Sequence, residues 1–100
     1  MTQATTFAPK FGSGITVSPG AASASSLIGL NNKSVCITNL SSSVVSYVRT
    51  GLTGLTATAA DYPIPPSAQV SISKPDDHDF IAYIAPAGGG SLHIMVGEGF

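Results

Sequence analysis

Charged side chains are scarce in this chain of 100 residues: four are Lys or Arg, five are Asp or Glu, and the formal net charge is −1. A protein that neutralises nucleic-acid phosphates needs a cation for each phosphate that it contacts. The basic residues Lys10, Lys33, Arg49 and Lys74 are instead scattered along the chain. We therefore expect no nucleic-acid partner.

Cysteine, tryptophan and long apolar runs are also lacking. Cys36 is the one cysteine and there is no tryptophan, so neither an intrachain disulfide nor a cysteine-based zinc cage is possible. A membrane-spanning helix needs about 20 apolar residues, and the N-terminus has neither the basic nor the apolar region of a secretory signal. We expect synthesis in the cytoplasm and no membrane partner.

Hydrophobic residues nevertheless make up 43% of the chain, and the mean hydropathy is +0.33. This composition is too apolar for an intrinsically disordered chain, which combines low hydrophobicity with high net charge. The length supports one domain with a small core. Since such a core is marginal on its own, association with something larger is favoured.

Apolar and polar residues alternate in short runs without a sustained helical period, which is typical of β-strands. The runs predict strands at residues 14–18, 26–30, 34–40, 44–50, 68–73, 80–85 and 91–97. Three serines join 34–40 to 44–50, which predicts a β-hairpin. The prolines within 63–66 exclude a central strand there, so we predict that residues 51–67 form a long connection.

These strands predict an all-β protein, a small antiparallel β-sandwich of the jelly-roll kind with seven or eight strands. The run 80–85 is apolar on both faces, so we expect an inner strand that is covered on both sides. Residues 1–13 are less regular and are predicted to form an extended N-terminal arm, with 14–100 as the single sandwich domain. The order of the strands does not follow from the sequence.

The predicted arm carries Phe7, Pro9 and Phe11. An apolar-tipped segment of this kind can become ordered when it lies along a neighbouring chain. We therefore take these three residues as candidate partner-binding residues. The alternative is a frayed terminus without a partner.

Residues 76–79, Asp-Asp-His-Asp, form the one cluster of side chains that commonly bind metals. They lack the alternating spacing, the glycine and the distal glutamate of a calcium loop. We interpret the cluster as a polar turn. The glycines at 88–90 lack the Lys and the following helix of a phosphate-binding loop, and they too predict a turn.

No group of residues is typical of a catalytic site. Cys36 lies in an apolar strand, where a thiol behaves as a small buried hydrophobe. His93 occupies a polar strand position without a neighbouring ligand at metal spacing, which predicts a surface or cross-strand histidine. We expect no catalytic residue, no metal ion, no cofactor and therefore no enzyme.

The order of features between residues 34 and 98 is distinctive. A strand ending in Asn-Leu precedes a strand with an aromatic residue and an Arg, a Thr-Ala-rich connection to a proline, another strand, a turn near a His with an Ile-Ala strand, and a closing Gly-Glu-Gly. These features are Val35–Leu40, Tyr47–Arg49, Thr56–Pro63, Val70–Ile72, His78–Ile84 and Gly97–Gly99. This order, over about two thirds of the chain, resembles small virion structural proteins of tailed bacteriophages.

The resemblance implies a head decoration, or cement, protein: a jelly-roll-like module that binds the outer surface of the assembled head and bridges major capsid protein subunits. It also implies a homo-oligomer, a dimer or a trimer, on the capsid surface of the virion. A weakly charged surface of Ser, Thr, Ala and Gly suits this role because it loses little hydration on contact. Many copies on a lattice also bind multivalently.

Two other classes share these features. A tail, baseplate or fibre-associated virion structural protein would differ only in its location on the particle. A carbohydrate-binding β-sandwich would need exposed aromatic residues or a calcium site, for which Tyr47, Tyr62 and residues 76–79 are the candidates.

Overall fold

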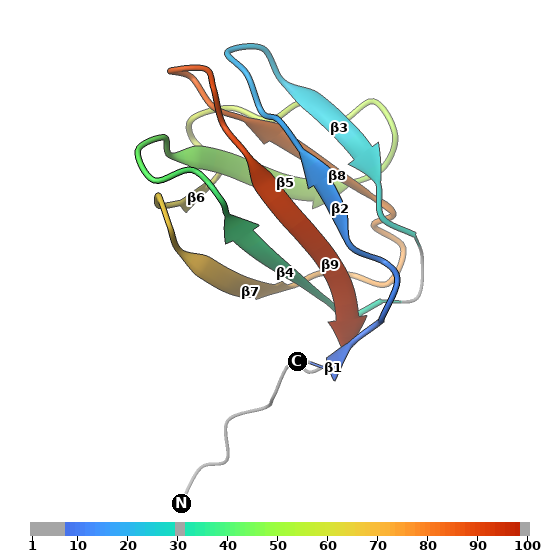
Figure 1. The fold of residues 1–100 in the computed structure, drawn as a ribbon. Helices are drawn as coiled ribbons and strands as arrows, with labels where there is room; N and C mark the ends of the chain where they lie inside the picture. Colours follow the sequence, from blue (N-terminus) through green and yellow to red (C-terminus); the bar gives the residue numbers. More distant parts are fainter. Residues whose placement is uncertain (1–7, 30–31, 99–100) are drawn as a thin grey trace, which may run out of the picture.

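The computed structural model describes residues 8–29 and 32–98, which form nine β-strands and no helix (Figure 1). The strands are β1 (Ala8–Pro9), β2 (Ile15–Val17), β3 (Ala24–Leu27), β4 (Ser34–Asn39), β5 (Ser46–Gly51), β6 (Tyr62–Ile64), β7 (Gln69–Ser73), β8 (Phe80–Ile84) and β9 (Leu92–Glu98). Nothing in these two ranges is a helix that is long and apolar enough to cross a membrane.

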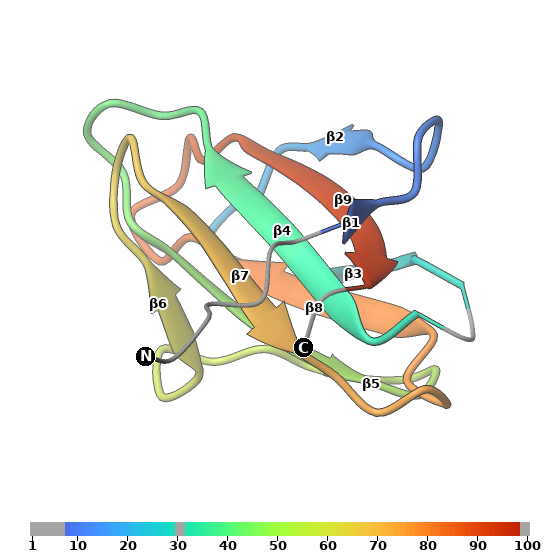
Figure 2. The same cartoon turned by 90° about the horizontal axis from the view of Figure 1, so that it is seen from below.

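The strands build two antiparallel sheets that face each other. Sheet A has the order β1-β9-β4-β7, with β2 also paired to β9, and sheet B has the order β3-β8-β5-β6. Figures 1 and 2 show β2 and β3 together at one edge of the sandwich, with β7 and β6 together at the other. The predicted all-β antiparallel sandwich is confirmed.

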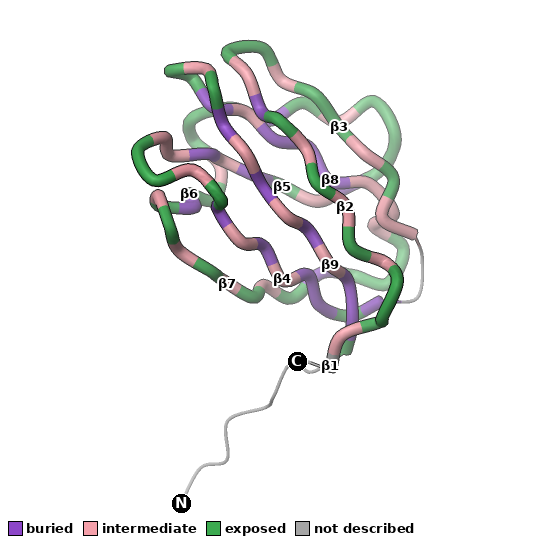
Figure 3. Tube along the Cα trace, viewed as in Figure 1, coloured by how far each residue is buried: buried purple, intermediate pink, exposed green. Residues whose placement is uncertain are grey.

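The core lies between the sheets, because alternate side chains of each strand point inward. Figure 3 shows this alternation along β4 and β9. The buried core side chains are Val35, Ile37, Leu92, Ile94 and Val96 of sheet A, and Val48, Ile64, Ile81 and Tyr83 of sheet B. The burial of these apolar side chains is the main stabilising contribution to the fold.

A buried asparagine joins the two sheets at one end of the sandwich. The Asn39 side chain of β4 donates from Nδ2 to the carbonyl oxygens of Val44 and Ile64, each at 2.9 Å, and accepts from the Ser41 N–H at 2.9 Å. Ile64 belongs to β6 of sheet B. The amide therefore satisfies backbone groups that would otherwise be buried without partners.

The predicted hairpin between residues 34–40 and 44–50 is wrong. The strand β4 pairs with β7 and β9, whereas β5 pairs with β6 and β8, so the serine loop carries the chain from sheet A to sheet B. Its serines bind backbone groups instead of closing a hairpin: Ser41 Oγ accepts from Val44 N at 3.0 Å. Side chains of this type compete with ladder hydrogen bonds.

The predicted long connection at 51–67 contains the short edge strand β6, which the sequence analysis missed. Its Pro63 is tolerated because β6 pairs only with β5, and proline is confined to sheet edges. The exclusion of a central strand at this place is therefore correct. The strand expected at 26–30 lies earlier, at Ala24–Leu27.

The inner strand expected at 80–85 is confirmed as β8. It lies between β3 and β5, and Ile81, Ala82 and Tyr83 are all buried. Tyr83 faces the core, where its hydroxyl lies 2.6 Å from Ser26 Oγ. Ala82 points to the outer face, which the connection after β5 covers.

The predicted turn after β8 is also present. Gly88 and Gly89 have positive φ angles of 75° and 70°, which favour glycine. Gly90 donates its N–H to the Pro19 carbonyl at 2.9 Å and lies too close to Ala85 for a larger residue to fit without a shift. Gly88 and Gly89 therefore allow the chain to turn, and Gly90 allows this turn to lie close to the loop that contains Pro19.

Candidate partner-binding surface

Two of the three candidate partner-binding residues lie in the described part of the chain, and Phe7 lies outside it. Pro9 belongs to β1 and pairs with Gly97 of β9. Phe11 follows in a turn and is 86% exposed, the highest value among the exposed large hydrophobic residues. The described residues 8–13 of the predicted arm thus lie against the edge of sheet A.

The loop that presents Phe11 is held by hydrogen bonds on both sides of the aromatic residue. Lys10 N donates to the Val96 carbonyl at 2.9 Å, and Ser13 N and Oγ donate to the Lys10 carbonyl at 3.1 and 2.6 Å. Residues 10–14 are called the Phe11 loop below. Because its backbone is anchored, Phe11 offers an apolar surface at a fixed position.

A shallow hollow of about 330 Å³ lies on the outer face of sheet A. Its lining residues are all formally uncharged with histidine neutral: Pro9, Cys36, Thr38, Gln69, Ser71, His93 and Met95. They come from β1, β4, β7 and β9. The register explains their grouping, because Cys36 lies opposite both Met95 and Ser71, and paired residues share a face.

Cys36 corrects one expectation. It is only partly buried and points outward into the hollow, because its neighbours Val35 and Ile37 take the inward positions of β4. The sequence analysis expected a small buried hydrophobe at Cys36, whereas the outer face of β4 is open at this position. His93, in contrast, is the predicted cross-strand histidine, opposite Thr38 and Thr16.

The Phe11 loop packs against the hollow through Gly14. A Cβ atom at this position would lie 2.7 Å from His93 Nε2 and 3.3 Å from Met95 Cε. Such contacts are too short for most residues, so glycine lets the loop approach these two side chains. Phe11 and the hollow are thus parts of one surface, which we call the sheet A surface.

A second set of apolar side chains lies on the outer face of sheet B. Leu27 of β3 pairs with Phe80 of β8, and Phe80 pairs with Gly51. A Cβ atom on Gly51 would meet Leu55 Cδ1 at 2.9 Å, so Leu55 covers this glycine. Leu27 and Leu52 are 62% and 57% exposed.

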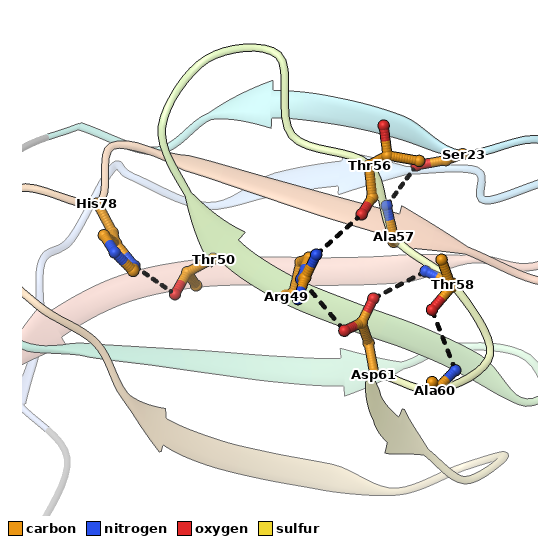
Figure 4. A network of polar contacts seen from close by, with 9 residues as sticks. All are labelled: Ser23, Arg49, Thr50, Thr56, Ala57, Thr58, Ala60, Asp61 and His78. Carbon is orange, nitrogen blue, oxygen red and sulfur yellow. Dashed lines mark hydrogen bonds and ion pairs between the residues drawn. The ribbon is translucent and has the colours of Figure 1, made fainter.

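A network of polar contacts around Arg49 and Asp61 holds the connection between β5 and β6 in place (Figure 4). Asp61 accepts from Arg49 Nε at 3.1 Å through one carboxylate oxygen and from Thr58 N at 2.7 Å through the other. Ala57 N donates to Ser23 Oγ at 2.8 Å. These bonds hold the connection between β5 and β6 across the outer face of sheet B, which explains why Ala82 is buried.

The acidic cluster at 76–79 is the predicted polar turn. His78 N donates to the Pro75 carbonyl at 3.1 Å, and His78 Nδ1 lies 3.0 Å from Thr50 Oγ1. Asp76 forms an exposed ion pair with Lys33 at 3.3 Å. Across residues 8–29 and 32–98, no three His, Cys, Asp or Glu side chains are grouped as metal ligands.

Lys74 is the one buried cation in the described ranges. It is 5% exposed, and its Nζ donates to the His78 carbonyl at 2.8 Å. Burial lowers the pKa of Lys74 from the ordinary 10.5, although Asp76, Asp79, Asp77 and Glu98 act in the opposite direction. The ammonium ties the turn to the end of β7 and is turned away from the sheet A surface.

Of the residues that line the hollow, the sequence analysis proposed only Pro9 as a partner contact and did not point to the other six. On β4, β7 and β9 these residues occupy alternate positions that face away from the core. This pattern indicates a common surface only when the strands are known to be neighbours. Comparison with known proteins adds no assignment: no family model, curated protein or solved structure matches the chain.

Proposed function

We propose that the chain is a bacteriophage head decoration (cement) protein. It binds the outer surface of the assembled head on the virion and stabilises contacts between major capsid protein subunits. The observation that carries the proposal is the sheet A surface, which combines a hollow lined by formally uncharged residues with the highly exposed Phe11 of the neighbouring loop. Such a face loses little hydration on contact, and an anchored aromatic residue supplies apolar area.

The arrangement of the strands supports a jelly-roll assignment. Two facing sheets with the orders β2-β9-β4-β7 and β3-β8-β5-β6 correspond to two Greek keys wrapped together. Jelly rolls occur in viral capsid proteins, lectins and cupins. Since a fold does not by itself imply a function, the surface carries the proposal and the fold is compatible with it.

Phe7, Pro9 and Phe11 are proposed as partner contacts of an N-terminal arm. Pro9 lines the hollow, and Phe11 is exposed in the loop that packs against His93 and Met95 through Gly14. A subunit that covers both the hollow and this loop would contact the two residues. Phe7 precedes β1 by one residue. An extended contact of this kind would let one copy span two capsid subunits.

A carbohydrate-binding module is the second candidate. The observation that favours it is Tyr62, which is 49% exposed on the edge strand β6, because sugars stack on exposed aromatic rings.

A tail or fibre protein would use the same sheet A surface at a different place on the particle.

Co-sedimentation with phage heads assembled without this protein tests the proposal. The wild-type chain should sediment with the heads at saturating stoichiometry, and Phe11→Ala should weaken binding at least tenfold. Leu52→Ala is the matched control, because Leu52 is 57% exposed and follows β5 of sheet B, away from the sheet A surface. No binding to heads, with binding to a glycan that Tyr62→Ala abolishes, would support the second candidate instead.

A further inference from the structure

The outer edge of β7 offers backbone groups to a further strand. Asn39 N donates to the Ala68 carbonyl at 2.8 Å and Lys74 N donates to the Lys33 carbonyl at 3.0 Å. Antiparallel alternation then directs residues 68, 70, 72 and 74 toward β4. The N–H and C=O groups of Gln69, Ser71 and Ser73 point the other way, where no strand of the described ranges pairs with β7.

This edge lacks the features that usually prevent strands from pairing. Proteins protect sheet edges with charges, prolines or bulges, and residues 69–73 contain no charge and no proline. The neighbouring edge strand β6 is protected by Pro63. Lys74, the charge nearest to the edge of β7, is directed into the 75–78 turn, where it donates to the His78 carbonyl.

Apolar side chains at the same edge are incompletely covered. Val70 and Ile72 point inward and pack against the core, yet both are only partly buried. Tyr62 of β6 pairs with the inward-facing Val48 and is half exposed at the same edge of the sandwich. A strand added to β7 would cover Val70 and Ile72, so pairing would bury apolar area as well as backbone groups.

We propose that a second copy of this chain pairs antiparallel with β7 about a two-fold axis at Ser71. Ser71 then faces Ser71 of the second copy, Gln69 faces Ser73, and Val70 faces Ile72. Gln69, Ser71 and Ser73, whose backbone groups point away from β4, donate one N–H each in both copies. This gives six backbone hydrogen bonds between the copies. The flanking Pro66 and Pro75 limit the pairing to this strand.

The absence of charge favours a second copy over an unrelated partner. Near a two-fold axis each residue meets its own counterpart, so a charged side chain would meet a like charge. Residues 69–73 avoid this conflict, and their outward side chains are Gln and Ser, which form neutral hydrogen bonds. The sequence of the strand is thus complementary to itself when reversed about Ser71.

The dimer has a geometric consequence for the sheet A surface. Paired residues share a sheet face, so Ser71 of both copies, and with it both hollows, would lie on the same side of one continuous sheet. Two equivalent binding surfaces on one side allow bivalent attachment to a repeating lattice. The dimer itself is a property of the free protein and does not depend on the head as its partner.

Sedimentation velocity on the purified full-length chain tests the proposal. The wild type should show a concentration-dependent dimer. Ser71→Lys and Ser71→Glu should each weaken the dimer at least tenfold, because like charges then face each other across the axis. An equimolar mixture of the two variants should restore a dimer, since opposite charges then face each other.

The mixture also controls for folding, because recovery of the dimer requires both variants to be folded. Ser25→Lys is the matched control on β3, the uncharged edge strand of sheet B, where Ser25 is exposed. It should dimerise as the wild type does. A wild type that stays monomeric, a dimer that survives Ser71→Lys, a mixture that stays monomeric, or dissociation by Ser25→Lys would each overturn the proposal.

Discussion

Ile81 and Ile84 lie on the same strand but on opposite faces of it. Ile81 is fully buried in the core between the sheets, whereas Ile84 points to the outer face and is only partly buried. The cost of a truncation depends on the cavity that it leaves. The two residues therefore contribute differently to stability, although both belong to the same apolar run.

We predict that Ile81→Ala lowers the free energy of unfolding by about 2–5 kcal/mol. Ile84→Ala should have a clearly smaller effect, because solvent or a neighbouring loop fills the space that it leaves. Urea denaturation followed by circular dichroism measures both. Equal losses for the two variants would mean that the assignment of inner and outer faces on β8 is incorrect.

The buried cation Lys74 makes a pH-dependent contribution to stability. Burial lowers its pKa in the folded state below the ordinary 10.5. Between the lowered pKa and 10.5 the unfolded chain binds more protons than the folded chain, so the free energy of unfolding rises with pH in that window.

The predicted result is a more positive slope of stability against pH, on approach to pH 10.5, for the wild type than for Lys74→Met. Chemical denaturation at a series of alkaline pH values gives both slopes. Because all other titrating groups are present in both proteins, the difference isolates Lys74. Parallel curves would show that this ammonium is as well solvated in the folded state as in the unfolded state.

At the scale of residues, the alternation of side chains divides β4 and β9 into two faces, and in the structure Val35, Ile37, Leu92, Ile94 and Val96 form the face in the core. The sequence could not predict that the outer face beside Cys36 is open. Whether an outer face is open depends on which strands and loops cover the sheet. The sequence of a single strand does not contain this information. The sequence showed Phe11 only as an apolar residue among turn-forming neighbours and did not reveal that its side chain is exposed.

At the scale of elements, the connection between β5 and β6 behaves as a cover for sheet B. The Arg49–Asp61 ion pair and the Ala57–Ser23 hydrogen bond fix it at several points (Figure 4). The Arg49 and Asp61 side chains are 51% and 12% exposed, so solvent still screens the cation and the ion pair makes a modest contribution to global stability. Its effect should be local.

Replacing Asp61 with Asn should therefore accelerate amide exchange at Ala57 and Thr58 by at least about tenfold, with a change in global stability within about 1 kcal/mol. Thr58 N loses a charge-assisted acceptor, and Arg49 loses its partner. Hydrogen exchange followed by NMR measures the two amides. Lys33→Gln, which breaks the exposed pair with Asp76, is the control and should leave both rates unchanged.

Element positions were predictable where the sequence alternates, as in β4, β5, β7 and β9, or where it is continuously apolar, as in β8. The pairing of the strands was not, because the sequence of a loop does not say whether it returns along the same sheet or crosses to the other. The serine loop after β4 is the clearest example, since Asn39 and Ser41 side chains hold it in the crossing form. The strand β6 was not predicted, because proline is unfavourable in strands and its presence argues against a strand in the sequence pattern.

At the scale of the whole molecule, three features underlie the proposed attachment to a regular surface. The hollow on the outer face of sheet A is lined by uncharged residues, Phe11 is exposed in the loop that packs against it, and the edge strand β7 carries no charge. The proposed attachment would depend on many copies acting together rather than on one strong interface.

Cryo-electron microscopy of heads mixed with the purified protein is the decisive measurement for the proposed function. We predict density for the chain at many equivalent positions on the outer surface of the shell, with the sheet A surface and Phe11 against the capsid subunits. Density confined to the tail or fibres, or heads that remain bare at saturating protein, would contradict it.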